Sequence, residues 1–145
     1  MTLGVVFPGQ GSQRVGMLEE AAGAFSVVRE TFSEASDALG YDMWALVSQD
    51  PDARLSLTEF TQPAILTASV ALFRAFESSH SIAPVAAAGH SLGEYSALVS
   101  ARALSLYDGV RLVRKRGAAM QKAVPVGEGA MAVDGTAERG GNRQG

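Results

Sequence analysis

Two short apolar runs and three longer stretches of three-to-four periodicity predict alternating strands and helices. Residues 3–7 and 85–88 are uninterrupted apolar runs, which is typical of buried parallel strands. Apolar residues recur every three or four positions over residues 18–39, 61–76 and 104–124, which is the spacing of amphipathic helices. The pattern therefore favours an α/β fold in which helices flank a parallel sheet.

Glycine, proline and capping residues refine the predicted limits of the helices. Gly23 is a candidate break within the first helix, because glycine lowers helix stability. Thr61 or Gln62 is expected near the cap of the second helix, with Pro63 in its first turn. The small side chains of residues 85–88 suit a tightly covered central strand.

The sequence Gly89-His90-Ser91-Leu92-Gly93 separates the second strand from a further helical pattern that continues through Val99. A strand, a G-x-S-x-G turn and a helix together make the nucleophile elbow of serine acyl enzymes. The two glycines leave room for a sharp turn at Ser91, and the N–H of Leu92 is the natural first donor to an oxyanion at the helix N-terminus. The alternative is an ordinary strand-to-helix turn that Ser91 caps.

A second glycine-containing loop, residues 8–13, follows the first strand. It is not a phosphate-binding P-loop, because no Gly-Lys-Ser/Thr follows, and Arg14 stands where a dinucleotide fingerprint needs its third glycine. Either the loop is a plain strand-to-helix turn, or its glutamines Gln10 and Gln13 line a site at the carboxyl edge of the sheet.

The last helical stretch carries basic residues at different positions around the helix. Lys115 and Arg111 point away from the apolar stripe, whereas Arg114 and Arg116 lie near its two edges. An arginine at such an edge either extends to water or holds a carboxylate in a bidentate clamp. The spacing by itself favours the first interpretation for both residues.

Composition narrows the function classes. The chain has 145 residues, 47% hydrophobic and 19% charged, and its formal net charge of -3 gives no reason to expect nucleic acid or a membrane as a partner. It contains no cysteine, which excludes thiolate catalysis. A zinc site would have to combine the two histidines with carboxylates, and no metal is expected. No signal peptide or membrane span is recognisable, so the cytoplasm is the expected compartment.

Four separated motifs carry a resemblance to a known family. They are Phe7-Pro8-Gly9-Gln10-Gly11-Ser12-Gln13, Thr61-Gln62-Pro63-Ala64, Gly89-His90-Ser91-Leu92-Gly93-Glu94-Tyr95-Ser96-Ala97-Leu98 and Arg116-Gly117-Ala118-Ala119-Met120-Gln121. Together they resemble the malonyl-CoA:acyl carrier protein transacylases of fatty acid synthesis, over a span from about residue 3 to Met131. Polyketide synthase acyltransferase domains are close relatives, but Gly-Glu-Tyr-Ser-Ala-Leu fits the stand-alone enzyme better.

The resemblance implies acyl transfer in two steps. A serine takes malonyl from coenzyme A, and the phosphopantetheine thiol of acyl carrier protein then takes it from the serine. Ser91 would be that nucleophile, with the backbone N–H groups of Gln10 and Leu92 as the oxyanion hole. Arg116 would clamp the free malonyl carboxylate, which replaces the first interpretation of that residue, and Gln62 would line the acyl or pantetheine pocket. Malonyl-CoA is then a substrate, and no cofactor is expected.

The resemblance also implies a general base, which family members carry as a histidine far downstream. His80 lies in a separate loop and the turn directs His90 away, so neither is expected to be that base. Family members are roughly twice this length, and their second half holds the base, the rest of the sheet and a small ferredoxin-like subdomain. We therefore expect a partial acyltransferase α/β domain at residues 1–132, without this subdomain, and a disordered tail unlike the family at residues 133–145. Truncation or a frameshift after about Met131 would explain both.

Three functions stay open at this stage. The first is malonyl transfer, by an enzyme or by part of one. The second is an α/β-type serine hydrolase or esterase, which the elbow alone would allow. A clamp at Arg116 favours the first, because an esterase needs no such cation. The third is a non-catalytic remnant that binds coenzyme A or acyl carrier protein, which the missing base favours, and the chain by itself is expected to be inactive.

Overall fold

The computed structural model describes residues 2–81 and 83–124, in which helices and two strands alternate. In chain order the elements are β1 (Gly4–Phe7), α1 (Glu19–Ala24), α2 (Ser26–Leu39), α3 (Met43–Ser48), α4 (Thr58–Ser79), β2 (Ala86–Gly89), α5 (Leu92–Ser100) and α6 (Leu106–Ala123). This order confirms the predicted α/β class. The predicted tail at residues 133–145 lies outside the described residues.

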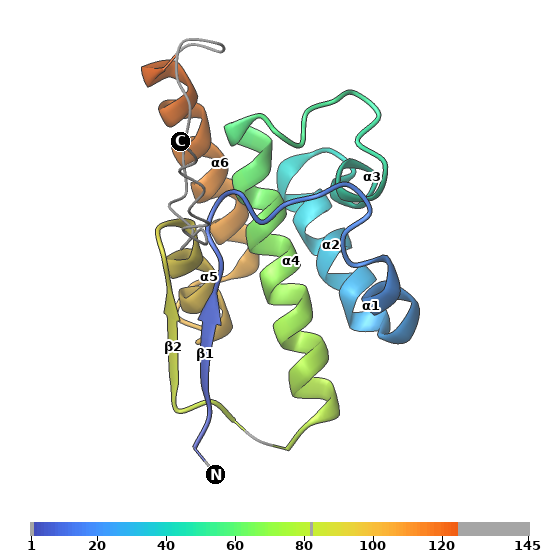
Figure 1. The fold of residues 1–145 in the computed structure, drawn as a ribbon, viewed down its shortest axis with the longest axis vertical. Coiled ribbons are helices and arrows are strands. Elements are labelled where there is room, and N and C mark those ends of the chain that lie inside the picture. Colours follow the sequence, from blue (N-terminus) through green and yellow to red (C-terminus); the bar gives the residue numbers. More distant parts are fainter. Residues whose placement is uncertain (1, 82, 125–145) are drawn as a thin grey trace, which may run out of the picture.

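The two strands pair in parallel, as their uninterrupted apolar sequences predict. Gly4 pairs with Ala86, and Phe7 pairs with Gly89. The arrows of β1 and β2 therefore end at the same edge of the sheet (Figure 1). This register matters for the site, because it brings the loop after Phe7 and the elbow after Gly89 to the same place.

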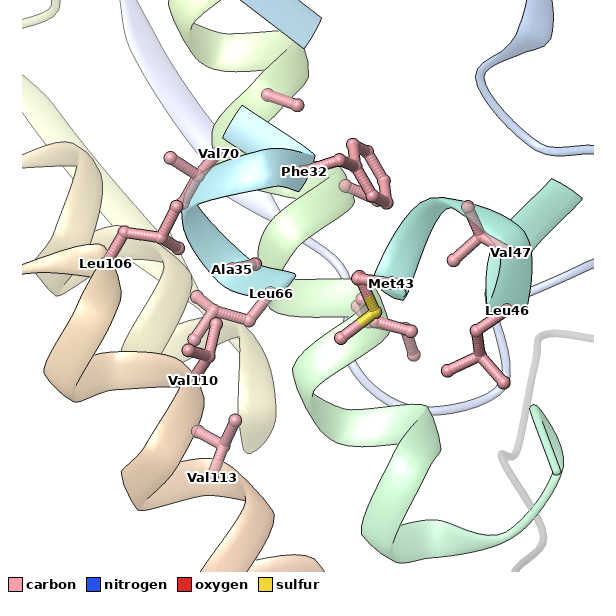
Figure 2. Close-up of a cluster of buried hydrophobic side chains, with 14 of the residues drawn as sticks. Phe32, Ala35, Met43, Leu46, Val47, Leu66, Val70, Leu106, Val110 and Val113 are labelled. Carbon is pink, nitrogen blue, oxygen red and sulfur yellow. The ribbon is translucent and has the colours of Figure 1, made fainter. Parts of the chain in front are cut away.

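The hydrophobic core lies among the helices rather than around the sheet. Helix α4 runs through the middle of the molecule and packs against α2, α5 and α6 (Figure 1). Leu66 of α4 meets Ala35 of α2 and Val110 and Val113 of α6, and all four side chains are buried (Figure 2). Because α4 has neighbours on several sides, its apolar residues cover most of its circumference instead of one stripe.

Two helix boundaries differ from the prediction. The stretch 18–39 is broken at Phe25, whose φ of -134° and ψ of 114° are extended, and not at Gly23, which stays helical. Helix α4 begins at Thr58, one turn before the predicted start, so Pro63 falls beyond the first turn. The hydroxyl of Thr61 donates to the carbonyl of Leu57, which helps to hold this added turn.

The strands are less buried than their apolar sequences predict. Phe7 packs edge-on against Phe73 of α4, with ring centroids 6.0 Å apart, and so belongs to the covered face of the sheet. On the opposite face Val6 is 83% exposed. Among the described residues, helices thus cover one face of the sheet, and the expectation of a tightly covered central strand was wrong.

Candidate active site

Ser91 occupies a strained turn between β2 and α5. Its φ of 55° and ψ of -110° lie in the left-handed half of backbone space, which a residue with a side chain rarely adopts. Its hydroxyl makes no capping hydrogen bond to the helix, and the residue is exposed. The capping alternative is therefore wrong. The strained turn exposes a hydroxyl group that the helix does not use as a cap.

The glycines on either side of Ser91 are needed for close backbone approach. A Cβ on Gly89 would overlap the backbone of Gly93 and Glu94, and a Cβ on Gly93 would overlap the carbonyl oxygen of Phe7. Strand β2, the N-terminus of α5 and the end of β1 therefore meet at backbone contact distance. Only glycine at both positions permits this arrangement.

The N-terminus of α5 points its N–H groups toward this turn. Gly93 donates to the carbonyl of His90 (2.9 Å) and Glu94 to that of Ser91 (3.2 Å). The N–H of Leu92 precedes both, and the first N–H groups of a helix have no partner within the helix. This leaves the Leu92 N–H suited to the predicted role as an oxyanion donor.

The loop that follows β1 packs against the elbow. A Cβ on Gly9 would lie 3.0 Å from the carbonyl oxygen of His90, so the two turns are in close contact. The side chain of the neighbouring Gln10 reaches the start of α4, where its Nε2 donates to Thr58 Oγ1 (3.1 Å). This anchor fixes the residue and leaves only its backbone N–H for the predicted oxyanion hole, a role that stays a prediction.

Arg116 links the elbow to the helical core. Its Nη2 donates to Ser91 Oγ (3.0 Å), and its Nη1 donates to Gln62 Oε1 (2.8 Å). The guanidinium also lies 5.7 Å from the ring centroid of Tyr95 on α5. The structure thus brings together Ser91, Arg116 and Gln62, which are far apart in the sequence, and Arg116 does not extend into water as its spacing alone suggested.

The charge of Arg116 has no carboxylate partner within residues 2–81 and 83–124. Some other arginines of the described chain do have one: Arg74 pairs with Glu34, and Arg114 pairs with Glu59. Within the described part of the chain, Arg116 bonds only to the neutral oxygens of Ser91 and Gln62. A guanidinium held in this way keeps the capacity to bind a carboxylate in a bidentate arrangement.

The two histidines do not contact the serine hydroxyl in the part of the chain that the structure describes. His80 is exposed, its ring stacks on Phe76 at 4.5 Å, and its Nδ1 lies 3.1 Å from the Phe76 carbonyl oxygen. The ring of His90 lies beside Gly9 of the neighbouring loop, with Nδ1 3.6 Å from the position of a Cβ there. The arrangement therefore supplies a serine, a cation and helix N–H groups, and neither histidine is in place as a base.

Sequence reasoning missed several residues that support the site. Thr58 anchors Gln10, and Met120 accepts a hydrogen bond from Gln62 through its sulfur. Tyr95 lies four residues after Ser91, and Met120 lies four residues after Arg116. Residues at this spacing lie on the same face of a helix, so both could have been found from the sequence.

Comparison with known proteins identifies the family. A family model described as "Acyl transferase domain" matches residues 5–142. The chain belongs to this acyl transferase family. The match continues past Met131, where the motif resemblance ends, into residues outside the described part of the chain.

Similar proteins are malonyl transacylases from bacteria. The Escherichia coli K12 protein named "Malonyl CoA-acyl carrier protein transacylase" is 60% identical over 127 residues, which is 88% of this chain and 41% of that protein. The Bacillus subtilis protein of the same name is 49% identical over 127 residues, with 88% and 40% covered. This acyl transferase chain therefore spans about two fifths of the length of these relatives.

Solved structures confirm the fold. The malonyl CoA-acyl carrier protein transacylase of Coxiella burnetii matches with a TM-score of 0.84 at 56% identity, covering 88% of this chain and 40% of that one. A malonyl-transacylase in complex with its type II polyketide synthase acyl carrier protein matches with a TM-score of 0.82 at 55% identity, covering 86% and 40%. The described residues are thus part of an acyl transferase α/β fold, as predicted. The domain limits at residues 132 and 133 stay a prediction.

Proposed function

We propose that this chain carries the serine and the carboxylate-binding side of a site for malonyl transfer from coenzyme A to acyl carrier protein. The observation that carries the proposal is the double contact of Arg116, which reaches Ser91 Oγ (3.0 Å) and Gln62 Oε1 (2.8 Å). A cation beside the nucleophile fits an acyl group that has a second, ionised carboxyl group. Malonyl-CoA serves as a substrate, the reaction needs no cofactor, and we expect it in the cytoplasm.

In the first step, Ser91 Oγ loses its proton to a base and attacks the thioester carbonyl carbon of malonyl-CoA. The carbonyl oxygen becomes an oxyanion, which accepts hydrogen bonds from the backbone N–H groups of Gln10 and Leu92. When the tetrahedral intermediate collapses, the C–S bond breaks and coenzyme A leaves as a thiol after taking up the proton. The product is a malonyl ester of Ser91.

The second step repeats this chemistry in the opposite direction. The phosphopantetheine thiol of acyl carrier protein loses its proton to the base and attacks the ester carbonyl carbon. The bond from that carbon to Ser91 Oγ breaks, and the serine oxygen takes up the proton. Malonyl then remains on the carrier as a thioester, and the serine is free for another cycle.

Arg116 would select the acyl group by binding its free carboxylate. A hydrogen bond to a charged group contributes about 1.5–3 kcal/mol, and acetyl has no carboxylate to form one. The bond from Arg116 Nη2 to Ser91 Oγ places the guanidinium within reach of a short acyl group on that oxygen. This selection distinguishes malonyl transfer from simple ester hydrolysis, which needs no cation.

A second candidate is a non-catalytic module that binds coenzyme A or acyl carrier protein. It is favoured by the placement of the only two histidines of the sequence, since His80 packs on Phe76 and His90 packs beside Gly9. Without a base the serine hydroxyl stays protonated, and acylation would be slow. Both candidates share the same binding site. They differ only in whether Ser91 is acylated and then regenerated in a catalytic cycle.

Mass spectrometry of the purified chain after prolonged incubation with malonyl-CoA tests the nucleophile. We expect a malonyl adduct on Ser91 and none in the Ser91→Ala variant. The variant should melt at nearly the same temperature, since it loses one exposed hydroxyl and a solvent-accessible hydrogen bond from Arg116. An adduct on Ser12 or Ser96 would overturn the assignment, and the absence of any adduct, together with measurable binding of coenzyme A, would favour the second candidate.

A further inference from the structure

We propose that Gln62 is a positioning residue for acyl selection, which fixes Arg116 through a neutral amide so that the positive charge stays available to a substrate carboxylate. This inference rests on the proposed function and adds to it. Sequence reasoning assigned Gln62 to the lining of the acyl or pantetheine pocket. Its contacts indicate a different role, because its side chain faces the core and Arg116 rather than an open pocket.

Both ends of the Gln62 amide are used by the same helix. The side chain is 0% exposed, its Oε1 accepts from Arg116 Nη1 (2.8 Å), and its Nε2 donates to Met120 Sδ (3.1 Å). Arg116 and Met120 are one turn apart on α6, so one glutamine spans that turn. A flipped amide would place its NH₂ group against the guanidinium N–H groups, so only one orientation satisfies both partners.

The backbones of α4 and α6 hold this contact in register. A Cβ on Gly117, next to Arg116, would lie 2.9 Å from Glu59 Cα and 3.0 Å from the carbonyl carbon of Thr58. The two helices therefore touch at the position that precedes Gln62 by one turn. Thr58 also anchors Gln10, so the first turns of α4 support both the arginine and the loop of the predicted oxyanion hole.

The neutral charge of the glutamine is the decisive property. A glutamate at position 62 would have nearly the same shape and would hold Arg116 more tightly, but it would neutralise the guanidinium. Such pairs exist elsewhere in the chain, as between Arg74 and Glu34. An apolar residue would leave Arg116 Nη1 without its acceptor, and the exposed Ser91 hydroxyl alone would hold the guanidinium, which would be freer to move. Glutamine alone orders the cation and preserves its charge.

Two variants separate these effects. Gln62→Met removes the acceptor at similar length, and Gln62→Glu keeps the acceptor and adds a negative charge. Gln49→Met and Gln49→Glu are matched controls, because Gln49 is exposed at the end of α3, away from the site. Thermal melting of all four variants shows whether each is folded before the site is assayed.

The first readout is the order of the Arg116 side chain, measured by ¹⁵N relaxation of its Nε–Hε group, which does not depend on activity. We expect an ordered Arg116 in the parent and in Gln62→Glu, and a mobile Arg116 in Gln62→Met. A mobile Arg116 in the parent itself would overturn the proposal, even if neither Gln62 variant folded. An Arg116 that stays ordered in Gln62→Met would also overturn it.

The second readout is the ratio of malonyl to acetyl adducts on Ser91 after incubation with equal amounts of the two coenzyme A thioesters. We expect this ratio to fall about tenfold in both Gln62 variants, since the lost charged hydrogen bond has this order of effect, and to stay unchanged in the Gln49 controls. An unchanged ratio in Gln62→Glu would overturn the role of the neutral charge. If the parent gives no adduct at all, the proposed function fails, whereas the relaxation experiment still decides whether Gln62 orders Arg116.

Discussion

The helical core and the two-stranded sheet of this chain are covered to very different extents. In the core, Phe32 is 1% exposed and Leu66 is 0% exposed, whereas Val6 on the open face of the sheet is 83% exposed. The candidate site lies across this boundary. Ser91 comes from the sheet side, and Arg116 and Gln62 come from the core side. The comparison indicates that the residues proposed to select the acyl group are packed more tightly than the proposed nucleophile, Ser91.

The largest expected effect concerns turnover. General-base catalysis contributes about 10²–10⁴-fold, and the described residues place neither histidine at Ser91. We therefore expect malonyl transfer to acyl carrier protein to be at least about a hundredfold slower than for the Escherichia coli relative assayed beside it. A turnover number within tenfold of that control would show that the sheet side contains a base that the geometry does not reveal.

The second expected effect is a difference in stability between the two regions. Leu66→Ala empties a fully buried position, and such changes cost about 2–5 kcal/mol. Val6→Ala removes methyl groups that already face solvent, and we expect less than about 0.5 kcal/mol. Urea denaturation of both variants measures the free energies of unfolding. Equal losses would show that the sheet face is covered in solution.

The third expected effect concerns the elbow. In Gly93→Ala the new methyl group would overlap the Phe7 carbonyl oxygen, and we expect a loss of about 1–3 kcal/mol from this overpacking. The matched control is Gly23→Ala, where a Cβ has no neighbour within 4 Å inside helix α1, and where we expect a gain of about 0.5–1 kcal/mol. The same denaturation experiment applies, and a neutral Gly93→Ala would contradict the close contact of β1 with α5.

The smallest expected effect on folding concerns the open face. Val6→Thr should change stability by less than about 0.5 kcal/mol, since this side chain is largely exposed. It should lower self-association, because exposed apolar surface favours it. Dynamic light scattering over a concentration series measures this. Val15→Thr is the control, because Val15 is 54% exposed in a loop away from the sheet. If Val15→Thr lowered self-association equally, the open face of the sheet would not be the surface that associates.

The same comparison explains what the sequence could reveal. The elements around Ser91 were predictable because β-strand and helix periodicities and the glycines of the turn are local signals. The burial of Val6 was predicted wrongly, since an apolar run indicates that a strand can be buried and not whether another element covers it. The start of α4 at Thr58 was missed because its first turn contains few apolar residues.

The contact between Gln62 and Arg116 lies beyond what periodicity can show. Spacing placed Arg116 at the edge of an apolar stripe, where an arginine either extends to water or turns inward. The choice depends on a buried acceptor supplied by α4, and on the backbone contact at Gly117 that brings the two helices together. Both are tertiary contacts between residues more than fifty positions apart in the sequence. Only the motif resemblance indicated that this arginine binds a carboxylate.

The most direct test of the central claim compares acyl preference in the parent chain and in Arg116→Ala. Each protein is incubated with equal amounts of malonyl-CoA and acetyl-CoA, and the adducts on Ser91 are quantified by mass spectrometry. We expect mainly malonyl on the parent and a malonyl-to-acetyl ratio about ten- to a hundredfold lower on the variant. An unchanged ratio, with Ser91 still acylated, would contradict the claim that Arg116 selects the acyl group.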